Sequence, residues 1–130
     1  MAEYKMVTSL NTSIGKKSFV ETQKKGLVPE GFFKINPSIG KCVFTLKGVF
    51  NESNISLICK VMTMSFSFQE RSMELEMSEV ETINMKAMAR LIIALKELEE
   101  QGINTAVKGL NEKKRRLAYE LGMNYITQIG

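Results

Sequence analysis

The spacing of apolar residues changes near residue 78, and this change limits the folds that the chain can adopt. From residue 4 to about residue 77, apolar and polar residues alternate in short runs, which is the period of a strand with one buried face. From Ser78 onward, apolar residues recur every three or four positions, which is the period of a helix. The sequence therefore predicts an α+β chain with its strands first and its helices last.

The clearest strand is KCVFTLKGVF, residues 41–50, in which alternate side chains share one face: Cys42, Phe44 and Leu46. RSMELEMS, residues 71–78, repeats the pattern with Met73, Leu75 and Met77. KSFVETQ and the segment around GFFKIN are further predicted strands, joined by a turn at residues 24–26. NESN, residues 51–54, has the composition of a turn.

The segment ISLICKVMTMSFSFQ, residues 55–69, is long enough for one strongly bent strand. Its apolar residues lie on one side as far as Val61 and on the other side from Met62, which predicts a bulge near that point. The fold class that follows is an antiparallel, strongly curved sheet of about five strands, or an OB-like barrel.

A helix is predicted to begin at SEVE, residues 78–81, because Ser78 and Glu81 have the spacing of a capping box. Its apolar stripe is Val80, Ile83, Ala87, Met88, Leu91, Ile92, Leu95 and Leu98, and Gly102 stands where the helix should end. A second helix is expected after Asn111, with Leu117, Leu121 and Tyr125 along one side. The short connection between them predicts an antiparallel helical hairpin.

Length and composition indicate a single domain over residues 1–130, divided into a mobile arm (1–12), a curved sheet (13–77) and two helices (78–130). The longest apolar run, residues 91–95, is too short to span a membrane, and the start of the chain lacks the apolar core of a secretory signal. We therefore expect a cytoplasmic protein with no membrane partner. Its two cysteines, Cys42 and Cys59, are expected to be buried and reduced.

The sequence has no His and no Asp, which leaves Glu, Lys, Cys and Tyr as the available groups for proton transfer. A Ser-His-Asp triad and a His-based metal site are therefore excluded. We expect no catalytic residue, no cofactor and no metal site, and hence a protein that is not an enzyme.

The charges are unevenly distributed along the chain. Residues 1–60 carry nine lysines against four glutamates, residues 61–102 carry four cations against eight glutamates, and residues 103–130 carry five cations against two glutamates. The two ends are therefore basic and the middle is acidic, which favours a polyanionic partner for the ends.

Most aromatic residues lie in the first 68 positions, interleaved with lysines. Exposed rings stack on unpaired bases and lysines neutralise phosphates, so this mixture is typical of proteins that bind single-stranded nucleic acid. Phe32 and Phe33 are adjacent, and in a strand one of the two must point away from the core. The alternative for most of these residues is that Phe forms the core and Lys the solvated surface.

About five strands with a bent central one, together with aromatics and lysines, resemble the small OB-type single-stranded-DNA-binding proteins of plasmids and phages, which are mobile genetic elements. The resemblance covers residues 4–77 and is one of layout. It implies sequence-tolerant binding of single-stranded nucleic acid, DNA more than RNA, by protomers that oligomerise along the strand. It also implies a terminal arm that docks on the next protomer, formed by Tyr4, Met6, Val7 and Leu10.

The leading hypothesis assigns nucleic-acid contacts to Phe32, Phe33, Lys24, Lys25, Lys34, Lys41, Lys47, Lys60 and Arg115. Arg115 belongs to the basic run of NEKKRRLAYE, residues 111–120, which is either a phosphate-contacting helix start or a solvated face. Two other functions stay open. One is a regulatory factor that binds a protein through the helical hairpin or a methionine-rich surface, and the other is an oligomeric sponge for small nucleotides.

Overall fold

The computed structural model of the chain describes residues 5–7, 31–38, 40–64 and 72–130. The strands are β1 (Lys5–Val7), β2 (Gly31–Ser38), β3 (Lys41–Phe50), β4 (Ser72–Ile83), β5 (Asn104–Lys108) and β6 (Gln128–Ile129). The helices are α2 (Glu52–Met64), α3 (Met85–Glu100) and α4 (Glu112–Glu120), and a short 3₁₀ helix, η2 (Met123–Tyr125), precedes β6.

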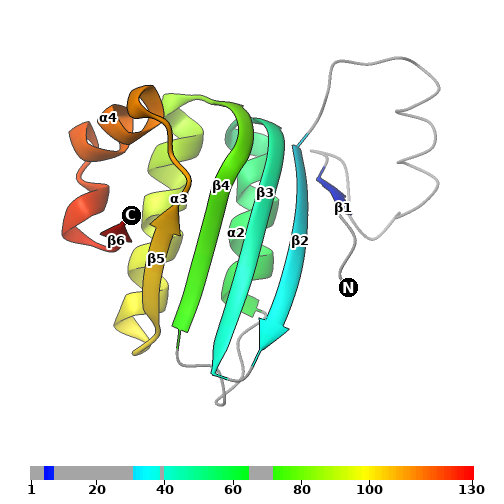
Figure 1. Cartoon of the computed structure of the whole chain (residues 1–130), viewed down its shortest axis with the longest axis vertical. Coiled ribbons are helices and arrows are strands. Elements are labelled where there is room, and N and C mark those ends of the chain that lie inside the picture. The colour runs from blue at the N-terminus through cyan, green and yellow to red at the C-terminus, as the bar shows by residue number, and fades with distance from the viewer. Residues whose placement is uncertain (1–4, 8–30, 39, 65–71) are drawn as a thin grey trace.

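The six strands form one sheet in chain order, β1-β2-β3-β4-β5-β6. β1, β2 and β3 pair antiparallel, whereas β3, β4, β5 and β6 pair parallel. Each parallel connection runs through a helix, and strands added in one direction by right-handed crossovers bring their helices to the same face. Figure 1 shows α2 and α3 side by side behind the sheet and α4 at the β5 end.

The core lies between the sheet and the pair α2 and α3. The alternation predicted for residues 41–50 and 71–78 is confirmed, because the inward side chains of β3 and β4 are all buried: Cys42, Phe44, Leu46, Met73, Leu75 and Met77. They pack with the buried residues of the two helices, among them Ile58, Met62, Met88, Leu91 and Leu95. Full burial of one such side chain stabilises a fold by about 1.5–3 kcal/mol, so this cluster dominates the stability.

The predicted bent strand over residues 55–69 is wrong, because residues 52–64 form α2. Ile55, Ile58 and Met62 are buried at helical spacing, which explains why the apolar face appeared to change sides in a strand. NESN begins this helix instead of forming a turn. Asn51 Oδ1 accepts from Asn54 N at 3.0 Å, and Asn54 Oδ1 accepts from Asn51 N at 2.8 Å, which satisfies two exposed backbone donors reciprocally.

The predicted helix start at Ser78 is also wrong, because residues 78–83 continue strand β4 and the helix begins at Met85. The register of β4 against β3 shifts between Thr45 and Lys47 and again between Gly48 and Val49. An extra β4 residue at each shift turns Val80 and Ile83 inward after Met77, so three strand residues acquire a helix-like spacing. The true cap is Asn84, whose Oδ1 accepts from Ala87 N at 2.8 Å.

The predicted helical hairpin is wrong because β5 lies between α3 and α4. The end of α3 is as expected: Gly102 has a φ of +85°, and Ile103 N donates to Leu98 O at 3.0 Å, as in a Schellman motif. The start of a second helix after Asn111 is confirmed as α4, but this helix ends at Glu120, so the predicted stripe does not extend to Tyr125, which lies in η2. The fold is therefore α/β with a mixed sheet, and the predicted antiparallel sheet or OB-like barrel with a C-terminal hairpin is wrong.

Within the described residues, no helix has the length and apolarity needed to cross a bilayer.

Candidate functional site

The structure brings four of the predicted nucleic-acid residues to one face of the sheet, namely Phe32, Lys34, Lys41 and Lys47, and places the other described ones elsewhere. In β2, Phe33 lies opposite the buried Leu46 and is itself only 7% exposed, so it belongs to the core. Phe32 lies opposite Lys47 and therefore faces the other side of the sheet. Lys34 and Lys41 share that side by alternation, which we call the polar sheet face, the face opposite α2 and α3.

The remaining predicted residues lie elsewhere. Lys60 is exposed on α2 and Arg115 is exposed on α4, so neither joins the polar sheet face. Lys24 and Lys25 lie outside the described residues, as do Tyr4 and Leu10 of the predicted arm. Met6 and Val7 are in β1, which pairs with β2 of the same chain, and the oligomerisation role of the arm stays a prediction.

Three charged side chains from adjacent strands meet on the polar sheet face. Glu74 Oε1 lies 3.1 Å from Lys41 Nζ and 2.9 Å from Lys108 Nζ. The hydrogen bonds from Lys108 and Lys41 hold the pKa of Glu74 below its usual value, and the same carboxylate raises the pKa of Lys108. Lys41 is thus partnered within the protein by a carboxylate that the sequence analysis did not single out.

A second polar group ties the end of α3 to the last strands. Glu99 Oε2 accepts from Thr105 N at 2.7 Å and lies 2.7 Å from Thr105 Oγ1, which is 2.6 Å from Thr127 Oγ1. A hydroxyl carries one proton and a carboxylate only accepts, so Thr105 donates to Glu99 and accepts from Thr127. Both threonines are buried, and this relay fixes the start of β6 against β5.

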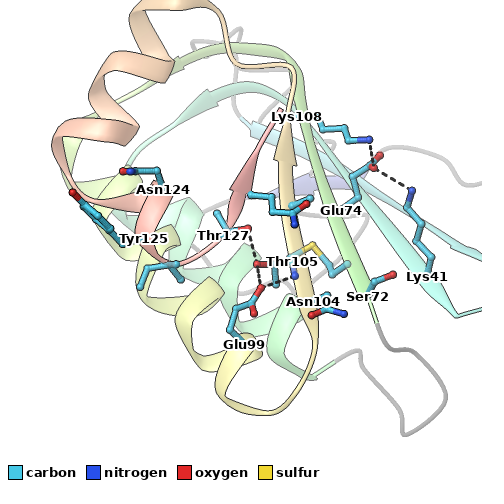
Figure 2. Close-up of a pocket in the computed structure, with 14 residues that line it drawn as sticks. Lys41, Ser72, Glu74, Glu99, Asn104, Thr105, Lys108, Asn124, Tyr125 and Thr127 are labelled. Atoms are coloured by element: carbon cyan, nitrogen blue, oxygen red, sulfur yellow. Dashed lines mark hydrogen bonds and ion pairs between the residues drawn. The ribbon is translucent and has the colours of Figure 1, made fainter.

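A cavity of about 700 Å³ lies beside these two groups, where η2 and the start of β6 pass β5 (Figure 2). We call it the β5–β6 trough. Its lining is Lys41, Ser72, Met73, Glu74, Glu99, Asn104, Thr105, Ala106, Lys108, Asn124, Tyr125, Ile126, Thr127 and Gln128. Tyr125 lies at the rim of the trough. Its side chain is 86% exposed, a higher value than that of any other large apolar or aromatic residue in the described part of the chain.

The outer face of α3 carries apolar side chains in contact with solvent. Met85 is 61% exposed and Ile93 is 52% exposed. At 3.6 residues per turn, Lys86, Ala89 and Arg90 lie on the same side of the helix as these two, opposite the buried stripe that includes Leu91. We call the set Met85, Lys86, Ala89, Arg90 and Ile93 the α3 outer face.

α4 presents its basic run to solvent in part. Lys113, Arg115 and Arg116 are exposed and Lys114 is half-buried, while Asn111 Oδ1 accepts from Lys114 N at 2.9 Å. Arg116 pairs with Glu112 one turn away at 3.4 Å. A pair this exposed contributes little to stability, so the run behaves as a solvated face with one local ion pair.

The two cysteines are free and buried, as predicted. Burial raises the pKa of Cys59 to about 11, and its thiol lies 3.7 Å from the Arg90 carbonyl oxygen as a weak donor. Cys59 is therefore a neutral core residue near pH 7 and not a nucleophile. The described residues contain no group of three or more His, Cys, Asp or Glu side chains placed to hold a metal ion.

Most of this geometry leaves no local signal in the sequence, but the exposed position of Ile93 does. Ile93 falls outside the apolar stripe that defines the buried side of α3, and this alone marks it as an exposed apolar residue. Glu74 stands between the buried Met73 and Leu75, so the alternation of the strand places it on the polar side but does not indicate its two lysine partners. The Thr105–Thr127 contact joins residues 22 positions apart, and no local pattern reports it.

No protein-family model matches the sequence, and no curated protein matches it. Solved structures do match. The protein TM1081 is 21% identical with a TM-score of 0.65, over 74% of this chain and 78% of that one. An anti-sigma factor antagonist from Mycobacterium paratuberculosis is 12% identical with a TM-score of 0.65, over 77% and 85%. The anti-sigma factor antagonist SpoIIAA in its unphosphorylated form is 14% identical with a TM-score of 0.61, over 75% and 87%.

The layers and the mixed sheet place the chain among two-layer α/β proteins. More particularly, the fold is that of the STAS domain, which a SulP transporter from Vibrio cholerae also carries.

The resemblance to OB-type single-stranded-DNA-binding proteins is therefore wrong, and so are the predicted function and the predicted nucleic-acid partner. The matching structures are STAS-type folds that include anti-sigma factor antagonists, and they are not OB folds. The physical reason lies in the lysines and rings. Phe33 packs in the core, Lys41 pairs with Glu74, and Lys60 and Arg115 lie on other surfaces, so the predicted residues do not form one continuous cationic surface.

Proposed function

We propose that this protein is a non-enzymatic regulator that acts by binding another protein through the α3 outer face. The observation that carries the proposal is the exposure of Met85 and Ile93, two large apolar side chains on the outer side of an otherwise well-packed helix. Exposed apolar side chains with polar or charged residues around them are typical of interaction sites, in which the apolar residues form the centre and the polar ones the rim. A protein partner was one of the functions left open by the sequence, but the binding surface is one face of α3 and not the predicted helical hairpin.

The named neighbours support a protein partner for this fold. Two of them are antagonists of anti-sigma factors, and the fold also matches a chain in the complex of the diguanylate cyclase SiaD with its activator SiaC. The chemistry of the α3 outer face specifies the partner further. Lys86 and Arg90 flank the apolar residues, and Lys96 and Glu97 lie one turn beyond Ile93 on the same side. The matching surface should therefore have an apolar centre and a rim that carries charges of both signs.

A non-enzymatic role fits the residues at hand. The sequence offers neither His nor Asp, and the thiol of Cys59 is buried and held neutral. We also place the protein in the cytoplasm, because two free, buried thiols suit a reducing compartment.

The test is a pull-down with tagged wild-type protein and two variants, Ile93→Glu and Tyr119→Glu. Both variants place a carboxylate at a half-exposed position, but Tyr119 belongs to another helix, α4, and not to the α3 outer face. We expect a protein that is retained by the wild type and by Tyr119→Glu and is lost with Ile93→Glu, as identified by mass spectrometry. Equal retention by all three proteins contradicts the assignment of the α3 outer face.

A further inference from the structure

The β5–β6 trough has the features of a second recognition site. It opens to solvent, because five of its lining residues are exposed: Asn104, Lys108, Asn124, Tyr125 and Gln128. Figure 2 shows the lysine pair and Tyr125 on opposite sides of β5 and its relay. The site lies around β5 and β6, whereas the α3 outer face lies on the solvent side of the helical layer.

The two lysines of the trough lie outside Glu74, whereas Glu99, the other carboxylate of the lining, accepts hydrogen bonds from Thr105. The side chains of Lys41 and Lys108 are 44% and 51% exposed, whereas that of Glu74, which both contact, is only 15% exposed. A group entering from solvent therefore meets two ammonium groups before it meets the carboxylate. Glu76 lies opposite Lys108 in the register, and its charge adds to the effect of Glu74 in raising the pKa of Lys108. Its Oε1 accepts from Ser78 N at 2.9 Å.

The rest of the lining suits a polypeptide chain. The side-chain amides of Asn104, Asn124 and Gln128 each offer both donors and an acceptor, which is what the backbone of an extended peptide requires. Tyr125 adds an exposed aromatic surface that can pack on the peptide with little loss of conformational entropy. A compact small molecule fits less well, since such ligands are usually enclosed over most of their surface and this cavity is open.

We propose that the β5–β6 trough binds an extended, acidic segment of a protein partner, whose carboxylates replace Glu74 in contact with Lys41 and Lys108. The inference rests on the proposed function in that the partner is a protein. It adds a second contact, of different chemistry, to the α3 outer face.

The test is an NMR titration of the ¹⁵N-labelled full chain with an end-blocked seven-residue peptide of alternating glutamate and serine. The control peptide has glutamine in place of glutamate. We expect saturable, salt-sensitive shifts of the amides of Asn104, Lys108 and Tyr125 with the acidic peptide and no saturation with the control. Inorganic phosphate in a parallel titration identifies a site for small anions: saturation by phosphate at equal or lower concentration overturns the peptide assignment.

Three variants decide whether the trough is responsible. Lys108→Gln should weaken binding of the acidic peptide about two- to fivefold, which is the range for one half-exposed ion pair. Glu74→Gln should strengthen binding by a similar factor, because the Glu74 carboxylate no longer competes with the peptide for the lysines. Lys113→Gln, an equal charge change on α4, should have no effect. Weakening by Lys113→Gln in place of Lys108→Gln, or equal binding by Glu74→Gln and wild type, overturns the inference.

Failure here and failure of the proposed function are distinguishable. Ile93→Glu should leave the peptide titration unchanged, because Ile93 is not part of the trough. If Ile93→Glu loses the protein partner but Lys108→Gln binds the peptide as the wild type does, the trough is not the peptide site and the assignment of the α3 outer face stands. If peptide binding depends on Lys108 but no protein partner depends on Ile93, the trough is the peptide site and the assignment of the α3 outer face is wrong.

Discussion

At the scale of single residues, Glu74 holds two ammonium groups with one carboxylate oxygen. The contact depends on ionisation of the carboxylate, and the lysines lower its pKa in the folded protein from the ordinary 4.5. A lowered folded-state pKa contributes stability that is fully present above the unfolded value and is lost as the pH falls through the folded one.

The pH dependence follows from this sign. Relative to Glu74→Gln, the wild type should gain a constant increment in the free energy of unfolding between about pH 6 and 8, and this gain should shrink as the pH drops below about 4.5. Urea unfolding of both proteins across this pH range measures the difference. If the difference in the free energy of unfolding between wild type and Glu74→Gln stays the same down to about pH 3, the ion pairs of Glu74 do not contribute to stability.

Thr127 is the donor that starts the relay to Glu99. Thr127→Val keeps the volume but leaves the buried Thr105 hydroxyl without its donor, and should lower the free energy of unfolding by about 1 kcal/mol. Ser78→Ala, at an exposed strand position, should change it by less than about 0.5 kcal/mol and serves as the control. Equal stability of Thr127→Val and wild type would show that the relay carries no net energy.

At the scale of elements, the sequence predicts well those segments whose burial repeats at one simple period. The strands at residues 41–50 and 71–78, the end of α3 at Gly102 and the start of α4 after Asn111 all follow from local pattern and capping. The errors arise where tertiary packing alters the period. Two register shifts give the end of β4 a helix-like spacing, and β5 has too few residues for its alternation to be recognised between two helices.

The start of α3 can be tested directly, because Ser78 and Asn84 are rival caps. Asn84→Ala removes the acceptor of the Ala87 amide and should cost about 1 kcal/mol in the free energy of unfolding, with loss of helix at that end. Ser78→Ala should cost far less. The measurement is urea unfolding followed by circular dichroism. A larger loss in the free energy of unfolding for Ser78→Ala than for Asn84→Ala would mean that the helix begins at Ser78.

The β5–α4 turn offers a further check on the packing of elements. Gly109 has a φ of +82°, and a Cβ there would collide with the Glu76 carboxylate and with Ser78 at the first register shift of β4. Gly109→Ala should therefore cost about 1–3 kcal/mol, whereas Gly102→Ala, also at positive φ but in open space, should cost the backbone strain alone. Thermal unfolding of the two variants measures the difference, and equal midpoints contradict this packing.

At the scale of the whole molecule, the mixed sheet presents two unlike surfaces. One is the helical layer with the exposed apolar residues of the α3 outer face, and the other is the polar sheet face with the β5–β6 trough at its β5 end. Of the residues chosen from the sequence, Lys41 does line the trough, but its partners Glu74 and Lys108 come from other strands. The order of the strands in the sheet determines which strands are neighbours, and no local sequence pattern predicts that order.

The central claim is that Ile93 lies in the contact with a protein partner. The most direct measurement is calorimetric titration of that purified partner into wild-type protein, Ile93→Glu and Tyr119→Glu. A charge placed at the centre of an apolar contact should raise the Kd by about 30-fold or more, while Tyr119→Glu should stay within about twofold. Equal Kd values for wild type and Ile93→Glu would contradict the account.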